Sequence, residues 1–430
     1  MKRFCIWMAG LLLAALTPSR TWAQQPQALT LQEAEKIAVQ NHPHVQAAEF
    51  LAKAASERVR ESRSVYYPTV GGSLTGVKTE NDSRIAAGFL NNPSVFSRFA
   101  DGIALSQVVT DFGRSYQLVK SSNLHAKAQA ENVTTARADV IIRVDQAYYG
   151  VLKAQAVLRV AQETVKDRQL VADQVGALAK NQLKSGLDVS FANVDLARAQ
   201  LLLVQAQNDL QSSFAELSTA LGYSDQRTFQ LADQPLPSAP PTDISTLIQE
   251  AMQDRPEIVS QRFDTESAFS FATAERDLWF PTISAVGVAG LVPYREAPLP
   301  SRYAAAGFNV NIPIFNGHLF DALRGEANAE ARAQQQSLRD TQNVIIREVQ
   351  KAWLNAISGY QRLALTDQLL DQATKAFDLA QSRYHLGLSS IIELSQAELN
   401  KTQAEIDQAS AKYDYQIEIS ALNYQAGQIR

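Results

Sequence analysis

Histidines, cysteines and carboxylates are the side chains of this 430-residue chain that could carry chemistry, and none is arranged for catalysis. His42 and His44 flank a proline and could form a metal pair, but the matching phrase of an internal repeat reads Arg255-Pro256-Glu257. A helix start shared by both repeats therefore explains the histidines better than a metal site does. No metalloprotease helix, phosphate-binding glycine loop or nucleophile elbow is present. The sequence predicts no enzyme activity, no cofactor and no metal.

The N-terminal residues predict export. Lys2 and Arg3 precede a short apolar run from Ile6 to Leu16, and Ala23 offers a small residue for cleavage. This is the layout of a secretory signal peptide, which we expect over residues 1–23. An uncleaved membrane anchor is the alternative, but the run is well short of the roughly 20 residues that a spanning helix needs.

Composition excludes several function classes. The single cysteine, Cys5, falls in the expected signal peptide, so the mature chain has no thiol for disulfides, catalysis or metal binding. Gln24 stands at the expected mature end, where a lipid would need a cysteine. Removing Lys2, Arg3 and Arg20 leaves 37 basic and 44 acidic residues, a formal net charge of −7. A mildly acidic chain without a basic stripe is not expected to bind nucleic acid.

The chain contains two copies of one pattern. The block from Asn41 to Val70 matches the block from Asp254 to Ile283 at an offset of 213 without a gap. A seam of apolar or small residues, spaced alternately by four and three, then covers 140–179 and returns at an offset of 205. A sustained seven-residue repeat indicates helices wound in a left-handed supercoil. An ordinary antiparallel helical bundle is the simpler alternative.

Long helices dominate the expected architecture. Residues 113–185 and 317–386 contain no proline and would each span about 105–110 Å at 1.5 Å per residue. Two shorter helices per repeat together match one long helix, and we expect them to stack end to end beside it. These shorter helices are expected over Thr30–Tyr66, 187–221, Leu247–Trp279 and 388–426.

Four segments between the helices predict strands, at about 69–80, 98–111, 282–293 and 303–315. In the last of them, apolar residues at even positions from Ala304 to Ile312 alternate with polar or small residues from Tyr303 to Asn311. Such alternation is typical of strands between lipid and a wet lumen. Four strands cannot close a barrel in lipid, so several chains must share one. Three copies would give 12 strands and room for a lumen.

These features together resemble the TolC-like outer-membrane efflux family over residues 30 to 428 or so. The resemblance rests on the order and repetition of short phrases rather than on any single one. They are the strand entries at Pro68 and Pro281, the strand exits at Gly113 and Gly317, and the tip phrases Lys184-Ser185-Gly186-Leu187 and His385-Leu386-Gly387-Leu388.

The resemblance implies a mainly α fold with membrane β-structure. Three chains would form a long coiled-coil α-helical barrel and a shared 12-stranded antiparallel β-barrel, with four strands per chain. The first structural repeat would cover residues 24–221 and the second residues 244–430. The Pro-rich linker over 222–243 would contribute to an equatorial belt.

The resemblance also implies the function and the partners. The chain would be the outer-membrane channel of a tripartite efflux or type I secretion system, passively exporting small molecules or polypeptides. Its partners would be two further copies, a periplasmic adaptor, an inner-membrane pump and outer-membrane lipid, with the helical tunnel in the periplasm. The alternative is a periplasmic coiled-coil adaptor or structural protein, which would not need lipid-facing strands.

Two groups of site residues follow from the resemblance. Adaptors would dock at the helical tips, at Gly186, Leu187, Gly387 and Leu388. The periplasmic entrance would carry Glu393, while Gln396 stands where a second carboxylate is expected, and Asp188 and Asp195 are the nearest acids in the other hairpin. Three Glu393 carboxylates at one level of a trimer would favour cations. The alternative is that Glu393 is an ordinary solvated helix residue.

Overall fold

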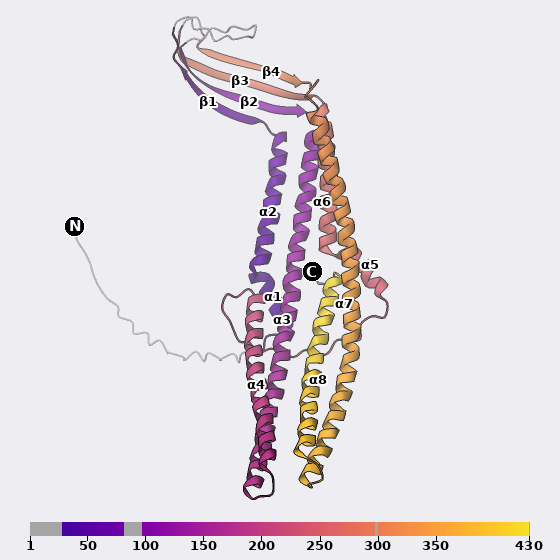
Figure 1. Cartoon of the computed structure of the whole chain (residues 1–430). Helices are drawn as coiled ribbons and strands as arrows, with labels where there is room; N and C mark the ends of the chain where they lie inside the picture. Colours follow the sequence, from indigo (N-terminus) through magenta and orange to yellow (C-terminus); the bar gives the residue numbers. More distant parts are fainter. Residues whose placement is uncertain (1–27, 81–96, 297–299, 430) are drawn as a thin grey trace, which may run out of the picture.

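The computed structural model describes residues 28–80, 97–296 and 300–429 and shows a long, narrow molecule with a curved sheet at one end (Figure 1). The expected signal peptide lies outside the described residues, as do residues 81–96 and 297–299 between the strands. Two helical hairpins, over residues 114–220 and 319–425, extend away from the sheet. Their tips, the turns over 181–185 and 386–390, lie together at the opposite end. The predicted mainly α fold, with long helices and four antiparallel strands in one chain, is confirmed. The sharing of one barrel among three chains stays a prediction.

Each repeat contains the same series of elements. The first contains α1 (Leu31–Asn41), α2 (Pro43–Arg63), β1 (Thr69–Val77), β2 (Arg98–Thr110), α3 (Arg114–Lys180) and α4 (Gly186–Ala220). The second contains α5 (Ile244–Asp254), α6 (Pro256–Arg276), β3 (Thr282–Arg295), β4 (Arg302–Asn311), α7 (Leu319–His385) and α8 (Ile391–Gln425). Helices α3 and α7 are each 67 residues long, which corresponds to about 100 Å. No helix among the described residues is long and apolar enough to cross a membrane.

The expectation of one helix over Thr30–Tyr66 is wrong, and so is its counterpart in the second repeat. His42 separates α1 from α2 with an extended backbone (φ −71°, ψ 126°), because the ring of Pro43 disfavours a helical conformation in the preceding residue. Arg255 separates α5 from α6 in the same way before Pro256. In both repeats the proline then occupies the first helical turn, where its missing N–H costs nothing.

A glycine at the end of each hairpin allows the expected end-to-end stacking. Gly222 follows α4 and Gly427 follows α8, both with positive φ (85° and 78°). An added Cβ at Gly222 would lie 3.1 Å from Cα of His42, and one at Gly427 would lie 3.3 Å from N of Arg255. Each hairpin therefore ends directly against the proline break of its own repeat. In the first repeat this contact places the end of α4 against the junction of α1 and α2. In the second repeat it places the end of α8 against the junction of α5 and α6.

The four strands form one antiparallel sheet in the order β1-β2-β3-β4. Pro68 and Pro281 immediately precede β1 and β3. At the strand exits, two consecutive residues have positive φ in each repeat, Phe112–Gly113 and Gly317–His318. Strand β4 ends at Asn311, four residues before the expected end, since Pro313 has no N–H to donate to a neighbouring strand.

The two faces of the sheet differ sharply. On one face, large apolar side chains are exposed, and Asp101 and Arg302 share one row near the loop end. The exposed residues of this apolar face are Val70, Leu74, Ile103, Leu105, Leu291, Phe308 and Val310. The opposite face carries mainly small and polar residues, among them Thr69, Ser106, Gly307, Ala104 and Ala305.

Exposed aromatic side chains flank the apolar face at both ends. Tyr67, Phe112, Trp279, Phe280 and Phe315 lie at the helical end, and Phe99 and Tyr294 lie at the loop end. Membrane β-barrels place aromatic girdles at the two lipid–water interfaces. The sheet therefore has the surface pattern of a wall that spans a bilayer.

The linker over 222–243 runs past the helices at about half the length of the molecule (Figure 1) and is held by buried tyrosines. The Tyr148 hydroxyl on α3 lies 2.8 Å from the Leu29 carbonyl oxygen and 2.6 Å from that of Ala232. The Tyr415 hydroxyl on α8 donates to the Ser238 carbonyl at 2.5 Å. Both tyrosine side chains are fully buried, so these bonds satisfy hydroxyl groups that burial would otherwise penalise.

Gly222→Ala is expected to lower the free energy of unfolding by about 1–3 kcal/mol, because alanine at positive φ is strained and its Cβ would press on the backbone of His42. Thermal unfolding of the detergent-solubilised protein measures this loss. The control is Gly150→Ala in α3, which meets no atom within 4 Å and should stabilise by about 0.5–1 kcal/mol. Equal unfolding temperatures for the two variants would contradict the stacking role.

Candidate functional site

The tips of the two hairpins form equivalent turns. The residue with positive φ is Gln182 in the first tip and Gly387 in the second, and these positions are 205 apart, which is the offset of the repeated seam. The N–H of Leu183 donates to the Leu178 carbonyl, as that of Leu388 donates to the Arg383 carbonyl. The structural equivalent of Leu388 in the first tip is therefore Leu183.

Gly186 and Leu187 occupy a different part of the tip from Gly387 and Leu388. Gly186 is the first residue of α4, after the N-cap Ser185, whereas Gly387 lies in the turn after α7. The two Gly-Leu phrases are thus similar in sequence but not equivalent in structure, and glycine shapes only the second turn. The tips nevertheless present several well-exposed apolar side chains, which are Leu183, Leu187, Leu386 and Leu388.

Asp188 and Glu393 are equivalent residues at the start of the second helix of each hairpin. Asp188 accepts hydrogen bonds from the backbone N–H and the hydroxyl of Ser185, at 2.9 Å and 2.8 Å. These bonds, the backbone one first, lower the pKa of Asp188. The Ser185 hydroxyl in turn accepts a hydrogen bond from the Asp188 N–H, so the two residues form a capping box at the start of α4. Glu393 instead forms an ion pair with Arg383 of α7 at 3.2 Å, and its side chain remains 45% exposed.

Asp195 and Gln396 lie on neighbouring helices a short way above the tips. Asp195 on α4 accepts a hydrogen bond from the Ser395 hydroxyl on α8 and lies 3.5 Å from Arg198. Gln396 donates to Asn400 of its own helix at 3.0 Å. Asp195 therefore connects the two hairpins, whereas the hydrogen bond of Gln396 to Asn400 lies within α8.

An apolar cluster holds the two hairpins together near the tips. At the tip itself, the Lys184 ammonium lies 3.9 Å from the centroid of the Tyr384 ring. A cation over an aromatic face is attracted by the ring quadrupole, so this contact joins the first tip to the second hairpin. The buried members of the cluster come from all four hairpin helices, and they are Ala172, Val175, Ala192, Ala380, Tyr384, Ile391 and Leu394.

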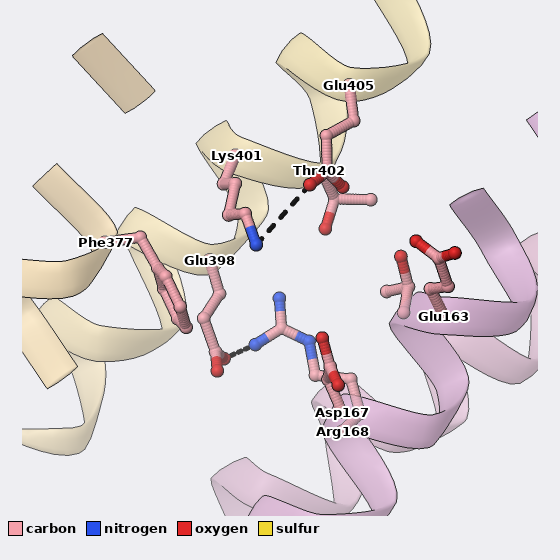
Figure 2. Close-up of a pocket in the computed structure, with 9 residues that line it drawn as sticks. Glu163, Asp167, Arg168, Phe377, Glu398, Lys401, Thr402 and Glu405 are labelled. Atoms are coloured by element: carbon pink, nitrogen blue, oxygen red, sulfur yellow. Dashed lines mark ion pairs between the residues drawn. The ribbon is translucent and has the colours of Figure 1, made fainter. Parts of the chain in front are cut away.

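Above this cluster, a buried ion pair crosses from one hairpin to the other (Figure 2). Arg168 of α3 pairs with Glu398 of α8, and their side chains are only 8% and 7% exposed. Glu163 and Asp167 line the same pocket, where Lys401 pairs with Glu405 at 3.4 Å.

The buried guanidinium remains charged. Burial lowers the pKa of Arg168, and the nearby carboxylates of Asp195 and Asp167 oppose that shift. The ordinary pKa of a guanidinium lies so far above neutrality that arginine is not deprotonated in proteins. The hairpins are therefore joined by a largely buried ion pair.

Arg168 and Glu398 were not among the residues predicted from the sequence. A signal was present, because Arg168 falls between Val165 and Ala172 at the spacing of the apolar seam. A charged residue at a seam position must find a buried partner. The sequence does not identify that partner, since Glu398 is 230 residues away and no local pattern connects the two.

A second group of titratable residues lies at mid-height. Burial, and next the charge of Glu35 on α1, raise the pKa of the buried Asp145 on α3 to about 7. Burial also raises the pKa of Glu35. Two adjacent carboxyls cannot both ionise freely, so titration near neutral pH is expected where α1 packs on α3. Within the described ranges, no group of three or more histidine, cysteine or acidic side chains is arranged to hold a metal ion.

Comparison with known proteins gives a consistent result. The family model described as outer membrane efflux protein matches residues 36–223 and 247–428. The cation efflux system protein CusC of Escherichia coli strain K12 is 24% identical over 359 residues, which cover 80% of this chain and 72% of CusC. The outer membrane protein TolC of the same strain is 22% identical over 384 residues, covering 85% of this chain and 75% of TolC.

The fold is also similar to that of solved outer membrane channels. The structure of the Campylobacter jejuni CmeC outer membrane channel matches with a TM-score of 0.80 and 17% identity. The match covers 99% of this chain and 94% of the other.

Arg168→Met is expected to lower the free energy of unfolding by about 3–5 kcal/mol, because it leaves the Glu398 carboxylate buried without a partner. Replacing both residues, with Arg168→Met and Glu398→Leu, should recover most of that loss. Thermal unfolding followed by circular dichroism measures both effects. The control is Lys375→Met, which removes an exposed pair with Asp371 and should change stability little. A single variant as stable as this control would contradict the role of the buried pair.

Proposed function

The chain belongs to the outer membrane efflux protein family, and we propose that three copies form one duct for passive export of small molecules or polypeptides. The chain is an outer membrane efflux channel with its helices in the periplasm, and it is not an enzyme. The alternative of a periplasmic adaptor or structural coiled coil is set aside, because the family match covers both repeats.

The observation that supports a trimer is the open four-stranded sheet. Strands β1 and β4 are the two edges of the sheet, and each has one side without a strand partner within the described residues. An unpaired backbone group in lipid costs several kcal/mol. Pairing β1 of one copy with β4 of the next satisfies both edges, and three copies give a barrel wide enough for a lumen.

The repeated order of the helices and strands supports the proposed division of the chain. The repeats over 24–221 and 244–430 would each supply one hairpin and two strands to the wall. The linker over 222–243 would form part of an equatorial belt, which its hydrogen bonds to Tyr148 and Tyr415 at mid-height support.

We assign adaptor docking to the tips. Members of the family work with an adaptor and an inner-membrane pump. The exposed side chains of Leu183, Leu187, Leu386 and Leu388 would pack against apolar residues of an adaptor helix. Because the duct is passive, the pump would supply the energy and would select the cargo, through either a tripartite efflux or a type I secretion system.

The mass of the detergent-extracted protein tests the proposed function. Light scattering with the detergent contribution subtracted should give the mass of three chains, because no chain can close the barrel alone. A water-soluble monomer would contradict the duct, since its strands would never meet lipid.

Glu393→Ala is expected to reduce the preference of the open channel for cations, because three Glu393 carboxylates would form one ring at the entrance. Arg383→Ala should act in the opposite direction, because it removes the cation that pairs with Glu393 at 3.2 Å. Reversal potentials in planar bilayers under a salt gradient measure both changes. Unchanged selectivity in both variants would assign Glu393 to an ordinary solvated helix face.

A further inference from the structure

One row of the sheet combines a large aromatic side chain with very small neighbours. The register aligns Ser73 of β1, Gly102 of β2, Gly290 of β3 and Tyr303 of β4 across the sheet. All four residues lie on the face opposite the apolar one. Tyr303 is the largest side chain in this row and in the adjacent row of that face, which consists of Gly71, Ala104, Val288 and Ala305.

The Tyr303 ring lies across both glycines. An added Cβ at Gly290 would lie 2.5 Å from Cζ and from the hydroxyl oxygen of Tyr303, and one at Gly102 would lie 3.1 Å from Cζ. The Tyr303 hydroxyl donates to the carbonyl oxygen of Asp101 on β2 at 3.5 Å. The side chain therefore reaches from β4 across β3 to β2, close to the backbone. Glycine inside a strand commonly marks such a close approach.

The face that carries Tyr303 would be the wet side of a membrane barrel. The opposite face exposes large apolar side chains and is flanked by aromatic girdles, which are the features of a lipid-facing surface. A large side chain on the Tyr303 face would extend into the lumen unless contacts with the sheet kept it flat against the backbone. Three copies would place three such rings at one level.

We propose that Gly102 and Gly290 form a recess that holds the Tyr303 ring out of the lumen, so that these residues determine the largest solute that passes the barrel. The inference rests on the proposed trimeric duct. A methyl group on either glycine would occupy the space of the ring and turn it towards the lumen. A purely structural role for the contact would instead weaken the sheet without changing the size limit.

Gly102 is the better of the two glycines to substitute. An added Cβ at Gly290 would also overlap the backbone carbonyl oxygen of Asp101, which cannot move without disturbing the sheet. At Gly102 the nearest backbone atom, the carbonyl oxygen of Ala289, would lie 3.2 Å away. Gly102→Ala therefore acts mainly on the Tyr303 side chain.

A cysteine placed beyond the ring tests the recess. Ala305→Cys lies on the same face, two residues nearer the helices than Tyr303, and the chain has one native cysteine, Cys5, within the expected signal peptide. Intact cells are treated from outside with a small maleimide or with a maleimide on a polyethylene glycol chain. The rate of labelling by the large reagent relative to the small one then reports the open width above position 305. Ala306→Cys, on the apolar face, is the matched control.

Adding Gly102→Ala should cause a several-fold loss of labelling of Ala305→Cys by the large reagent, with little change for the small one. Adding Tyr303→Ala as well should restore the rate. An unchanged large-to-small ratio in the Gly102→Ala variant, with the trimer mass preserved, would overturn the recess.

Two further outcomes keep the inference separate from the proposed function. Tyr303→Ala alone should leave the ratio unchanged, because the ring already lies outside the lumen, and a several-fold rise would overturn the recess even if Gly102→Ala fails to assemble. Labelling of Ala306→Cys rather than Ala305→Cys would mean that the apolar face lines the lumen and the Tyr303 face meets lipid. That result would overturn the proposed wet side, and with it the inference, whatever the behaviour of Gly102→Ala.

Discussion

Backbone hydrogen bonding in lipid is the constraint on which the rest of the structure depends. The sheet of one chain satisfies its inner strands and leaves β1 and β4 as open edges, and a bilayer offers no water to pair with them. In the proposed trimer, sharing one barrel among three chains would remove the edges. Each chain would then supply only part of the wall, and exposed apolar residues of the hairpins, such as Leu201 and Leu354, would pack against the neighbouring copies.

Thin walls need contacts that differ from those of a globular core. The seam of α3 buries small and β-branched residues such as Val140, Val144 and Ala161, and small side chains allow neighbouring helices to approach closely. Buried polar contacts occur at two levels along the helices, one beside the linker and one near the tips. Tyrosine hydroxyls hold the linker at mid-height, and the buried Arg168–Glu398 pair joins the hairpins near the tips. Such a pair favours one arrangement of the hairpins, because separating its charges without water is costly.

Glycine has three distinct roles in this chain. Gly222 and Gly427 adopt a left-handed backbone conformation in close contact with the residues at the proline breaks. Gly387 forms part of a tip turn, and Gly102 and Gly290 leave space for the Tyr303 ring. The tips also show that residue identity does not fix the role, since Gln182 adopts the conformation of Gly387. Gly186, in the phrase that resembles the second tip, begins a helix instead.

The sequence by itself determined the duplication, the long helices, the four strands and the alternation of their faces, because these depend on residues a few positions apart and on periods of 3.6 and 2. The sequence also contained Pro43 and Pro256, which break the helices at His42 and Arg255, although a continuous helix was predicted across each of them. Only the tertiary structure decided the partner of Arg168, the contact of Gly222 with His42 and the position of Tyr303 over Gly102. Each of these depends on how whole helices and strands pack, and no local preference of the chain sets which distant residues then meet.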